Sequence, residues 1–290
     1  MRSFENSSQI IEALDRQHYV AEEEFATALF LLLKLHKPLL LEGPPGVGKT
    51  EIALVLAQLL ETELIRLQCY EGLDVNAAVY EWNYQKQLLG IKLQEGSNLS
   101  IEEKEKHIFG PDYLLERPLL HSIRAEDQSP VLLIDELDRS DEEFEAFLLE
   151  LLSAFQISIP ELGTIKSKHK PFVILTSNRT RELSDALKRR CLYHWIDYPT
   201  LEKEMAIVKK HLPGIEEKLL QQLVSVVQQF RERKLVKVPG VSETIDWAES
   251  LLALGYRDIN AAVFDQTLGC ILKSSEDINQ VRAEGVNVFI

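Results

Sequence analysis

Cysteine and histidine are too sparse in this chain of 290 residues to support a disulfide framework or a zinc site. The three cysteines, Cys69, Cys191 and Cys270, are odd in number and widely spaced, which fits reduced thiols buried as small apolar side chains. None of the seven histidines shows metal-ligand spacing. The composition therefore argues against a disulfide-stabilised secreted protein and against a zinc-stabilised fold.

Long hydrophobic runs are also missing from the sequence. The longest ones, such as residues 28–33, are far too short to span a bilayer. The opening residues, MRSFEN, lack the apolar stretch that follows the basic start of a signal peptide. We therefore expect a cytoplasmic protein with no membrane span.

Positive charge is in deficit, with 32 Lys and Arg against 46 Asp and Glu and a net charge of -14. Such a charge repels a phosphate backbone, and the sequence offers no sustained Lys/Arg stripe, so we expect no nucleic-acid partner. The hydrophobic fraction of 45% is ordinary for a globular protein. A chain of this length can hold one α/β domain with a smaller appendage.

One strong motif is present. Residues 43–50, GPPGVGKT, match the phosphate-binding pattern G-x-x-x-x-G-K-T, between an apolar strand-like run at 38–42 and a helical pattern at 51–60. Glycines let backbone N–H groups turn inward on a polyphosphate, and the new helix points its positive end at the same anion. A chance Gly/Pro turn is the alternative, and the flanking strand and helix disfavour it.

The motif predicts a nucleotide site in which the Lys49 ammonium reaches the outer phosphates and the Thr50 hydroxyl binds Mg²⁺. The predicted nucleotide-binding residues of this loop are Gly43, Pro44, Pro45, Gly46, Val47, Gly48, Lys49, Thr50 and Glu51. Tyr19 and Val20, just before a helical pattern that opens at Ala21, are candidates for contact with the adenine ring. Packing of both side chains in the core explains them equally well.

A second apolar run, Pro130 to Ile134, ends in Asp135 and Glu136. Ligands bind at the carboxyl ends of strands in an open parallel sheet, and a phosphate-bound Mg²⁺ needs an acid at the tip of a neighbouring strand. We therefore predict that Asp135 binds the metal and that Glu136 is the general base that polarises water. The alternative is a solvated strand end.

Two further features follow along the chain. Asn178 ends a buried strand pattern at 172–178, where it either orients the attacking water or merely caps the next turn. Arg189 and Arg190 stand just before another strand pattern at 192–196, and arginine pairs on a surface are usually only solvated.

The remaining patterns predict an α/β domain with a parallel sheet over residues 1–199 and a small all-helical lid domain over residues 200–290. A segment at about 83–110 has little apolar periodicity and is predicted to be a surface insertion. Further predicted elements are a strand at 64–68, helices at 75–82 and 112–124, a helix opened by a capping box at 140–143, a hairpin at 156–166, and lid helices at 202–212, 215–233, 242–254 and 260–273.

This order of elements resembles an AAA+ ATPase, and within that superfamily the MoxR family. The stretches at 64–74, 80–84 and 192–199 are similar to its CoxD-like branch. The resemblance implies that Lys49 and Thr50 belong to the Walker A loop, Asp135 and Glu136 to Walker B, and Asn178 to sensor 1. Arg190 stands at the arginine finger, or Arg189 if the register is off by one. No arginine occurs in 239–244, where many relatives carry sensor 2.

The resemblance further implies a ring, usually of six subunits, that uses ATP and Mg²⁺ to remodel or mature a client protein complex. It implies a partner with a von Willebrand factor A domain, and a CoxD-like role in cofactor maturation of a molybdenum hydroxylase such as carbon monoxide dehydrogenase. A nucleic-acid motor or clamp-loader-like AAA+ ATPase is one alternative function, and an ATP-binding regulatory module with little turnover is another.

Overall fold

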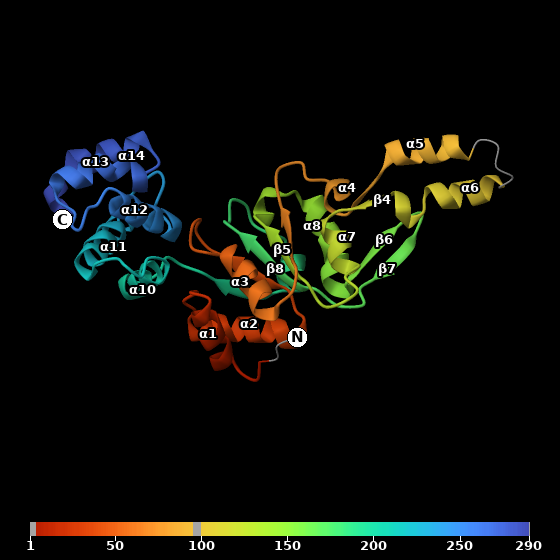
Figure 1. The fold of residues 1–290 in the computed structure, drawn as a ribbon, viewed down its shortest axis with the longest axis horizontal. Helices are drawn as coiled ribbons and strands as arrows, with labels where there is room; N and C mark the ends of the chain where they lie inside the picture. Colours follow the sequence, from red (N-terminus) through yellow and green to blue (C-terminus); the bar gives the residue numbers. More distant parts are fainter. Residues whose placement is uncertain (1–3, 95–99, 290) are drawn as a thin grey trace. The chain divides into compact units, whose positions relative to one another are not determined.

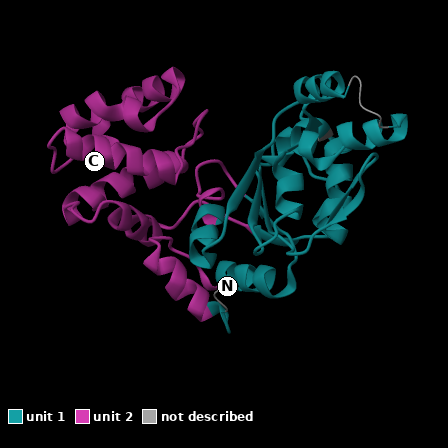
Figure 2. Ribbon diagram, turned by 45° about the vertical axis from the view of Figure 1, so that its right-hand side comes forward, with its two compact units in different colours: residues 1–7, 24–42, 53–194 teal, residues 8–23, 43–52, 195–290 magenta. Residues whose placement is uncertain are grey.

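The computed structural model describes residues 4–94 and 100–289 (Figure 1). The chain folds into two compact units that alternate along the sequence (Figure 2). The first consists of residues up to 7, 24–42 and 53–194, and the second of residues 8–23, 43–52 and 195–290. The predicted single boundary between residues 199 and 200 stays a prediction.

A five-stranded parallel sheet forms the centre of the first unit, with strand order β2-β5-β8-β1-β9. Its strands are β1 (Leu39–Glu42), β2 (Leu64–Gln68), β5 (Val131–Asp135), β8 (Phe172–Ser177) and β9 (Leu192–Trp195). Every residue of β1, β5 and β8 is buried, as near-continuous apolar sequences predict for strands covered on both faces. The predicted α/β class with a parallel sheet is confirmed.

Helices and two small antiparallel strand pairs complete this part of the chain. The helices are α2 (Glu23–Leu35), α3 (Glu51–Leu60), α4 (Val75–Ala78), α5 (Tyr84–Leu93), α6 (Ile101–Ile108), α7 (Pro118–Ile123), α8 (Glu142–Ala154) and α9 (Asp185–Lys188). Two antiparallel pairs join β3 (Tyr80–Trp82) to β4 (Leu114–Glu116) and β6 (Gln156–Ile159) to β7 (Gly163–Lys166). Figure 1 shows α5 and α6 side by side. Residues 95–99 of the predicted insertion lie outside the described residues.

Two predicted helices were wrong, because some of their residues form the strands β3 and β4, which pair with each other. The expected helix at 75–82 ends at Ala78 and gives way to β3. The expected helix at 112–124 is a 3₁₀ turn (η1, Pro111–Tyr113), then β4, and only then α7, which starts with Pro118. Because a residue before proline avoids helical backbone, Arg117 is extended and separates the strand from the helix.

The predicted start of α8 was also wrong by one residue. The capping residue is Asp141, whose carboxylate accepts the N–H of Phe144 at 2.8 Å. Ser140 instead turns its hydroxyl back to the carbonyl oxygen of Leu137 at 2.8 Å. An aspartate at this position caps as well as a serine, so the sequence allowed either residue.

The second unit is helical. It contains most of α1 (Ser7–Arg16), then α10 (Leu201–His211), α11 (Glu217–Arg231), α12 (Val241–Ala253), α13 (Ala261–Ile271) and α14 (Ser275–Glu284). A core of its own includes Phe230, Trp247 and Phe264, all fully buried. The predicted lid helices are present, and α14 was missed. In the described part of the chain, no helix combines the length and apolar character that a membrane crossing requires.

Candidate functional site

The predicted phosphate loop runs from the end of β1 to the start of α3. Gly46 and Gly48 adopt φ values of +75° and +90°, which side-chain-bearing residues rarely adopt. Lys49 is only 6% exposed, and its ammonium donates to the carbonyl oxygens of Gly43 at 2.7 Å and Pro44 at 2.6 Å. The loop is therefore closed around the lysine that is predicted to meet the outer phosphates.

The residues that follow the loop begin α3. Thr50, just before α3, and Glu51, its first residue, are both exposed. The first N–H groups of a helix carry partial positive charge, which favours an anion there. This arrangement suits a polyphosphate that enters the loop from the side of the new helix.

Tyr19 and Val20 follow α1 and are half-buried. Burial raises the pKa of the Tyr19 phenol, and the carboxylates of Glu51 and Glu22 raise it further. Tyr19 and Glu51 belong to the same unit of the chain. Adenine contact by Tyr19 and Val20 stays a prediction.

In the first unit, the carboxylate of Asp135 is held at the end of β5. Asp135 is 2% exposed, and its Oδ1 accepts the hydroxyl of Thr176 at 2.6 Å. Its Oδ2 pairs with the Arg66 guanidinium, also at 2.6 Å. Thr176 lies on the neighbouring strand β8 and Arg66 on the other neighbour, β2. Two strands therefore fix the orientation of this acid.

The next residue, Glu136, has a backbone that is unusual for a residue with a side chain. Its φ of +53° is left-handed, a conformation that costs about 1 kcal/mol or more outside glycine. Its N–H donates to the hydroxyl oxygen of Thr176 at 2.9 Å. Its Oε2 accepts the Gln68 amide at 3.0 Å and pairs with Arg139 at 3.1 Å. The turn thus aims the two adjacent carboxylates at different partners.

Asn178, which follows β8, is tied through Asp138 to the short turn after β5. The buried Asp138 carboxylate accepts the N–H of Asn178 at 3.1 Å. It also accepts the N–H of Thr180 at 2.9 Å and the Thr180 hydroxyl at 2.7 Å. Desolvation acts to raise the pKa of Asp138, but the hydrogen bonds from Thr180 and Asn178 outweigh it and the net pKa is lowered.

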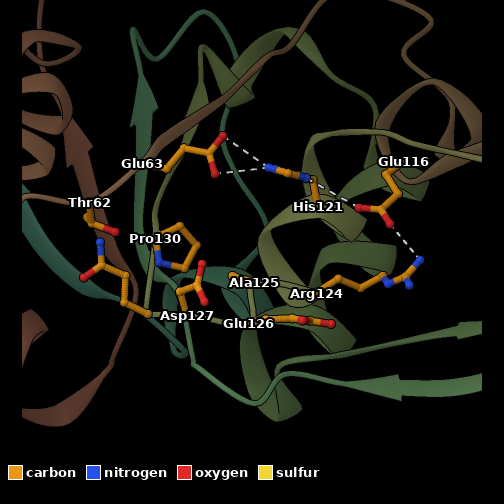
Figure 3. Close-up of a pocket in the computed structure, with 10 residues that line it drawn as sticks. Thr62, Glu63, Glu116, His121, Arg124, Ala125, Glu126, Asp127 and Pro130 are labelled. Atoms are coloured by element: carbon orange, nitrogen blue, oxygen red, sulfur yellow. Dashed lines mark hydrogen bonds and ion pairs between the residues drawn. The ribbon is translucent and has the colours of Figure 1, made fainter.

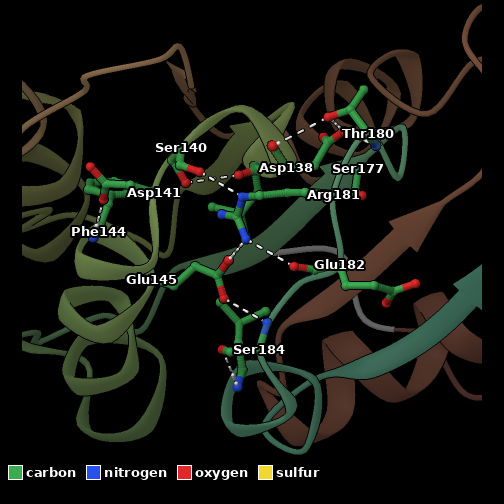
Figure 4. Close-up of polar contacts among 12 residues, drawn as sticks. Asp138, Ser140, Asp141, Phe144, Glu145, Ser177, Thr180, Arg181, Glu182 and Ser184 are labelled. Atoms are coloured by element: carbon green, nitrogen blue, oxygen red, sulfur yellow. Dashed lines mark hydrogen bonds and ion pairs between the residues drawn. The ribbon is translucent and has the colours of Figure 1, made fainter.

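A second buried contact fixes the same loop. The Arg181 guanidinium pairs with the buried Glu145 carboxylate and donates from Nε to the carbonyl oxygen of Ser140 at 2.8 Å. Glu145 also accepts the N–H of Ser184 at 2.9 Å (Figure 4). The segment after β8 is therefore anchored to α8 as well as to the turn that follows β5.

Arg190 is placed on the surface, after α9. Its Nε donates to the Ser153 hydroxyl at 2.6 Å and its NH1 group to the carbonyl oxygen of Ala186 at 2.8 Å. Arg189 caps the end of α9 and is exposed. Two contacts thus orient the Arg190 side chain without covering it.

The sequence of this chain matches a known protein family. A family model described as AAA domain (dynein-related subfamily) matches residues 38–191, more than half of the chain. The chain belongs to this family. It is 24% identical over 276 residues to the gas vesicle ATPase GvpN of Haloferax mediterranei, which covers 87% of this chain and 73% of that protein.

Other relatives of this AAA domain extend the comparison. An uncharacterized protein of Staphylococcus aureus is 25% identical over 229 residues, which cover 77% of this chain and 78% of that protein. Structures of two Thermotoga maritima RuvB mutants match with TM-scores of 0.50 and 0.51 at 18% and 19% identity. They cover 92% and 87% of this chain and 70% of each RuvB chain. The RuvB likeness concerns the fold alone and supports the predicted P-loop AAA+ architecture.

The carboxylate of Asp135 in this AAA domain suits Mg²⁺. Asp135 offers a buried, oriented carboxylate, and Mg²⁺ takes such an oxygen together with phosphate oxygens and waters. Within residues 4–94 and 100–289, no cluster of His, Cys, Asp and Glu forms an all-protein metal cage. Asp135 would therefore suit an ion that arrives with a nucleotide and takes its other ligands from phosphate and water, and such an ion would polarise the transferred phosphoryl group.

A pocket of about 360 Å³ in the AAA domain lies elsewhere (Figure 3). Its lining residues precede β2 and β5, so it opens at the amino ends of these strands. His121 contacts Glu63 at 3.1 Å and Glu116 at 3.4 Å, and Arg124 pairs with Glu116 at 2.6 Å. Because Gln68 and Asp135 stand at the opposite ends of the same strands, this pocket is not the candidate nucleotide site.

Sequence reasoning missed several residues of the site. Arg66, Thr176 and Asp138 contact the predicted acids or Asn178 from other elements. Asp138 stands three residues after Asp135, but nothing in the local sequence marked it as a partner of Asn178. Arg66 and Thr176 lie in strands that read only as buried or half-buried sheet, so nothing local marked them.

Proposed function

We propose that this AAA-family protein is a ring-forming ATPase that hydrolyses ATP to ADP and phosphate with Mg²⁺. The observation that carries the proposal is the pair of adjacent acids Asp135 and Glu136 at the end of a buried strand. Each carboxylate is held by its own partners. A metal ligand and a base must present their carboxylates in different directions, and this turn does so. The similarity to a protein named an ATPase supports the same activity.

In this proposal each residue has a distinct task. Lys49 binds the outer phosphates, Thr50 and Asp135 hold the metal, and Glu136 accepts a proton from the attacking water. Asn178 orients that water. The proposal also keeps Tyr19 and Val20 at the adenine, the segment 43–51 around the phosphates, and a cytoplasmic location for the protein.

The decisive experiment is Glu136→Gln. Loss of a general base typically costs about 10²–10⁴-fold in turnover, while Asp135 and Lys49 remain to hold metal and phosphate. We expect unchanged ATP affinity by calorimetry and almost no phosphate release. Glu249→Gln, an exposed change on α12, is the matched control. Turnover of Glu136→Gln within a factor of two of the parent would contradict the assignment.

A second test addresses the phosphate loop. Lys49→Ala should abolish tight ATP binding, because the loop has no second lysine or arginine to reach the outer phosphates. The measurement is the ATP dissociation constant by calorimetry. An unchanged constant would show that the loop does not hold the nucleotide.

The ring part of the proposal rests on Arg190. In P-loop enzymes, an arginine supplied by a neighbouring molecule is worth about 10³–10⁵ in rate. Arg190→Ala should bind ATP normally, hydrolyse it poorly, and regain part of its activity when mixed with Glu136→Gln subunits. Mixed interfaces then pair an intact Glu136 with an intact Arg190. Normal hydrolysis by both Arg190→Ala and Arg189→Ala would exclude a shared site.

For the biological role we propose a MoxR-like chaperone of the CoxD-like branch, which remodels or matures a client enzyme complex. The sequence resemblance at 64–74, 80–84 and 192–199 supports this role. A von Willebrand factor A domain protein and a molybdenum hydroxylase are the expected partner and client. The test is co-purification from the native source with and without ATP, in the Glu136→Gln background that should retain clients. DNA-stimulated turnover with no such partner would instead favour a nucleic-acid motor.

A further inference from the structure

The phosphate loop makes a direct contact with the start of α12, and both belong to the helical unit. The N–H of Val241, the first residue of α12, donates to the carbonyl oxygen of Gly46 at 2.8 Å. The first N–H groups of a helix have no partner within the helix. Here the N–H group of Val241 binds the phosphate loop, which lies far earlier in the chain.

The contact requires glycine on both sides. A Cβ atom on Gly240 would lie 2.7 Å from the Gly46 Cα and 2.9 Å from its carbonyl carbon and oxygen. A Cβ atom on Gly46 would lie 3.0 Å from the Gly240 Cα. These are backbone atoms, which cannot swing aside as a flexible side chain does. Two backbones therefore meet at a distance that only glycine permits.

The turn that carries Gly240 is anchored to the helical core. The Arg231 Nε donates to the carbonyl oxygen of Pro239 at 3.0 Å. The same guanidinium binds both oxygens of Glu204 at 2.7 Å, and the Arg231 and Glu204 side chains are 6% and 0% exposed. Thr244 of α12 donates its hydroxyl to Glu204 at 2.7 Å. A buried, bidentate ion pair thus fixes the position of the turn.

The hydrogen bond to Gly46 also sets the direction of a peptide group. In a trans peptide the C=O and N–H bonds point to opposite sides, and the described residues contain no cis peptide. Because the Gly46 carbonyl points at α12, the N–H of Val47 points away from it. Phosphate loops bind their anion through N–H groups of this kind.

We infer that Gly240 and Val241 are positioning residues for nucleotide binding, because they hold the Gly46–Val47 peptide with its N–H turned toward the phosphates. This inference rests on the proposed ATPase function. The segment 239–244 contains no arginine that could contact the nucleotide directly. The helical unit acts on the phosphate loop through the main chain instead, and this contact links the loop to α12.

Two substitutions separate the hydrogen bond from the close approach. Val241→Pro removes the donor, and proline is well tolerated at the first position of a helix. Gly240 is extended, with φ -85° and ψ -175°, which suits a residue before proline. Gly240→Ala forces the backbones apart. The matched controls are Val241→Ala, which keeps the donor, and Gly214→Ala, because Gly214 has nothing within 4 Å of an added Cβ.

The measurement is ATP affinity by calorimetry, with the melting temperature of the nucleotide-free protein as a check on folding. Loss of one hydrogen bond should weaken binding by Val241→Pro about threefold to tenfold. Gly240→Ala should lose at least as much, whereas Val241→Ala should stay closer to the parent and Gly214→Ala should match it. If either Val241→Pro or Gly240→Ala melts several degrees below the parent, the ATP affinity of the other variant tests the inference. Parental affinity in the folded test variants would overturn this inference alone, whereas a parent that does not bind ATP would overturn the proposed function as well.

Discussion

The hydrogen bonds of Asp138 allow a quantitative test of how Asn178 is held. Asp138 is 3% exposed, and its carboxylate accepts the N–H groups of Asn178 and Thr180 and the hydroxyl of Thr180. Asp138→Asn keeps the size of the side chain but replaces one acceptor oxygen with an NH₂ group. That group faces a backbone donor, with which it cannot form a hydrogen bond.

The expected cost follows from these contacts. A hydrogen bond to a charged acceptor contributes about 1.5–3 kcal/mol, and a buried donor left without its acceptor costs about 1–3 kcal/mol. Because the Thr180 hydroxyl can rotate to accept from the new amide, only part of the set is lost. We expect Asp138→Asn to lower the free energy of unfolding of the sheet unit by about 2–4 kcal/mol.

Two assays check this expectation. Urea unfolding gives the loss of free energy, and hydrogen exchange gives it locally through the protection of the Asn178 and Thr180 amides. Turnover should fall with the loss of protection, because Asn178 is predicted to orient water. Asp127→Asn, an exposed change, is the control. Unchanged protection of both amides in Asp138→Asn would refute the reasoning.

The same carboxylate predicts a pH dependence. The hydrogen bonds lower the folded pKa of Asp138 below the value of about 3.9 for an unfolded aspartate. A depressed pKa contributes stability that is fully present above the unfolded pKa and is lost as the pH falls through the folded pKa. The stability difference between the parent and Asp138→Asn should therefore persist from neutral pH down to about pH 4 and shrink below it. An equal difference at pH 7 and pH 3 would contradict this account.

Three further predictions follow from single contacts. Arg231→Ala leaves the buried Glu204 without its counter-charge and should cost about 3–5 kcal/mol, seen by calorimetry as early melting of the helical unit. Gln68→Ala removes the amide hydrogen bond to the Glu136 carboxylate and leaves only its ion pair with Arg139, so it should lower kcat up to about tenfold with ATP affinity unchanged, a pattern that equal loss of both would refute. Gly90→Ala places a methyl group 2.4 Å from a buried tyrosine hydroxyl and should destabilise α5 by about 1–3 kcal/mol, measured by hydrogen exchange.

The sequence predicted the sheet well, because its strands are short apolar runs. The runs at 38–42 and 130–136 contain β1 and β5, and β5 ends at Asp135. The acids and the lysine could be found because their motifs are local. The contacts that these residues make in the folded chain depend on segments far away in the sequence. Local motifs therefore do not predict them.

The missed features are contacts between segments far apart in the chain. Thr176 is 41 residues from Asp135, and its sequence context is that of any buried strand. The helix expected at 112–124 failed because pairing of β3 with β4 overrides local propensity. The glycine pair at 46 and 240 shows the same limit, since each glycine alone reads as a turn.

The alternation of the two units has a consequence for dissecting the protein. Residues 43–52 share their contacts with residues 195–290, although they lie between two segments of the sheet unit along the chain. A fragment cut at 199/200 would therefore separate Val241 from Gly46 and expose the Gly240 turn to water. Limited proteolysis should yield fragments that stay associated after cleavage, and the isolated amino-terminal fragment should lose the exchange protection that the loop has in the whole chain.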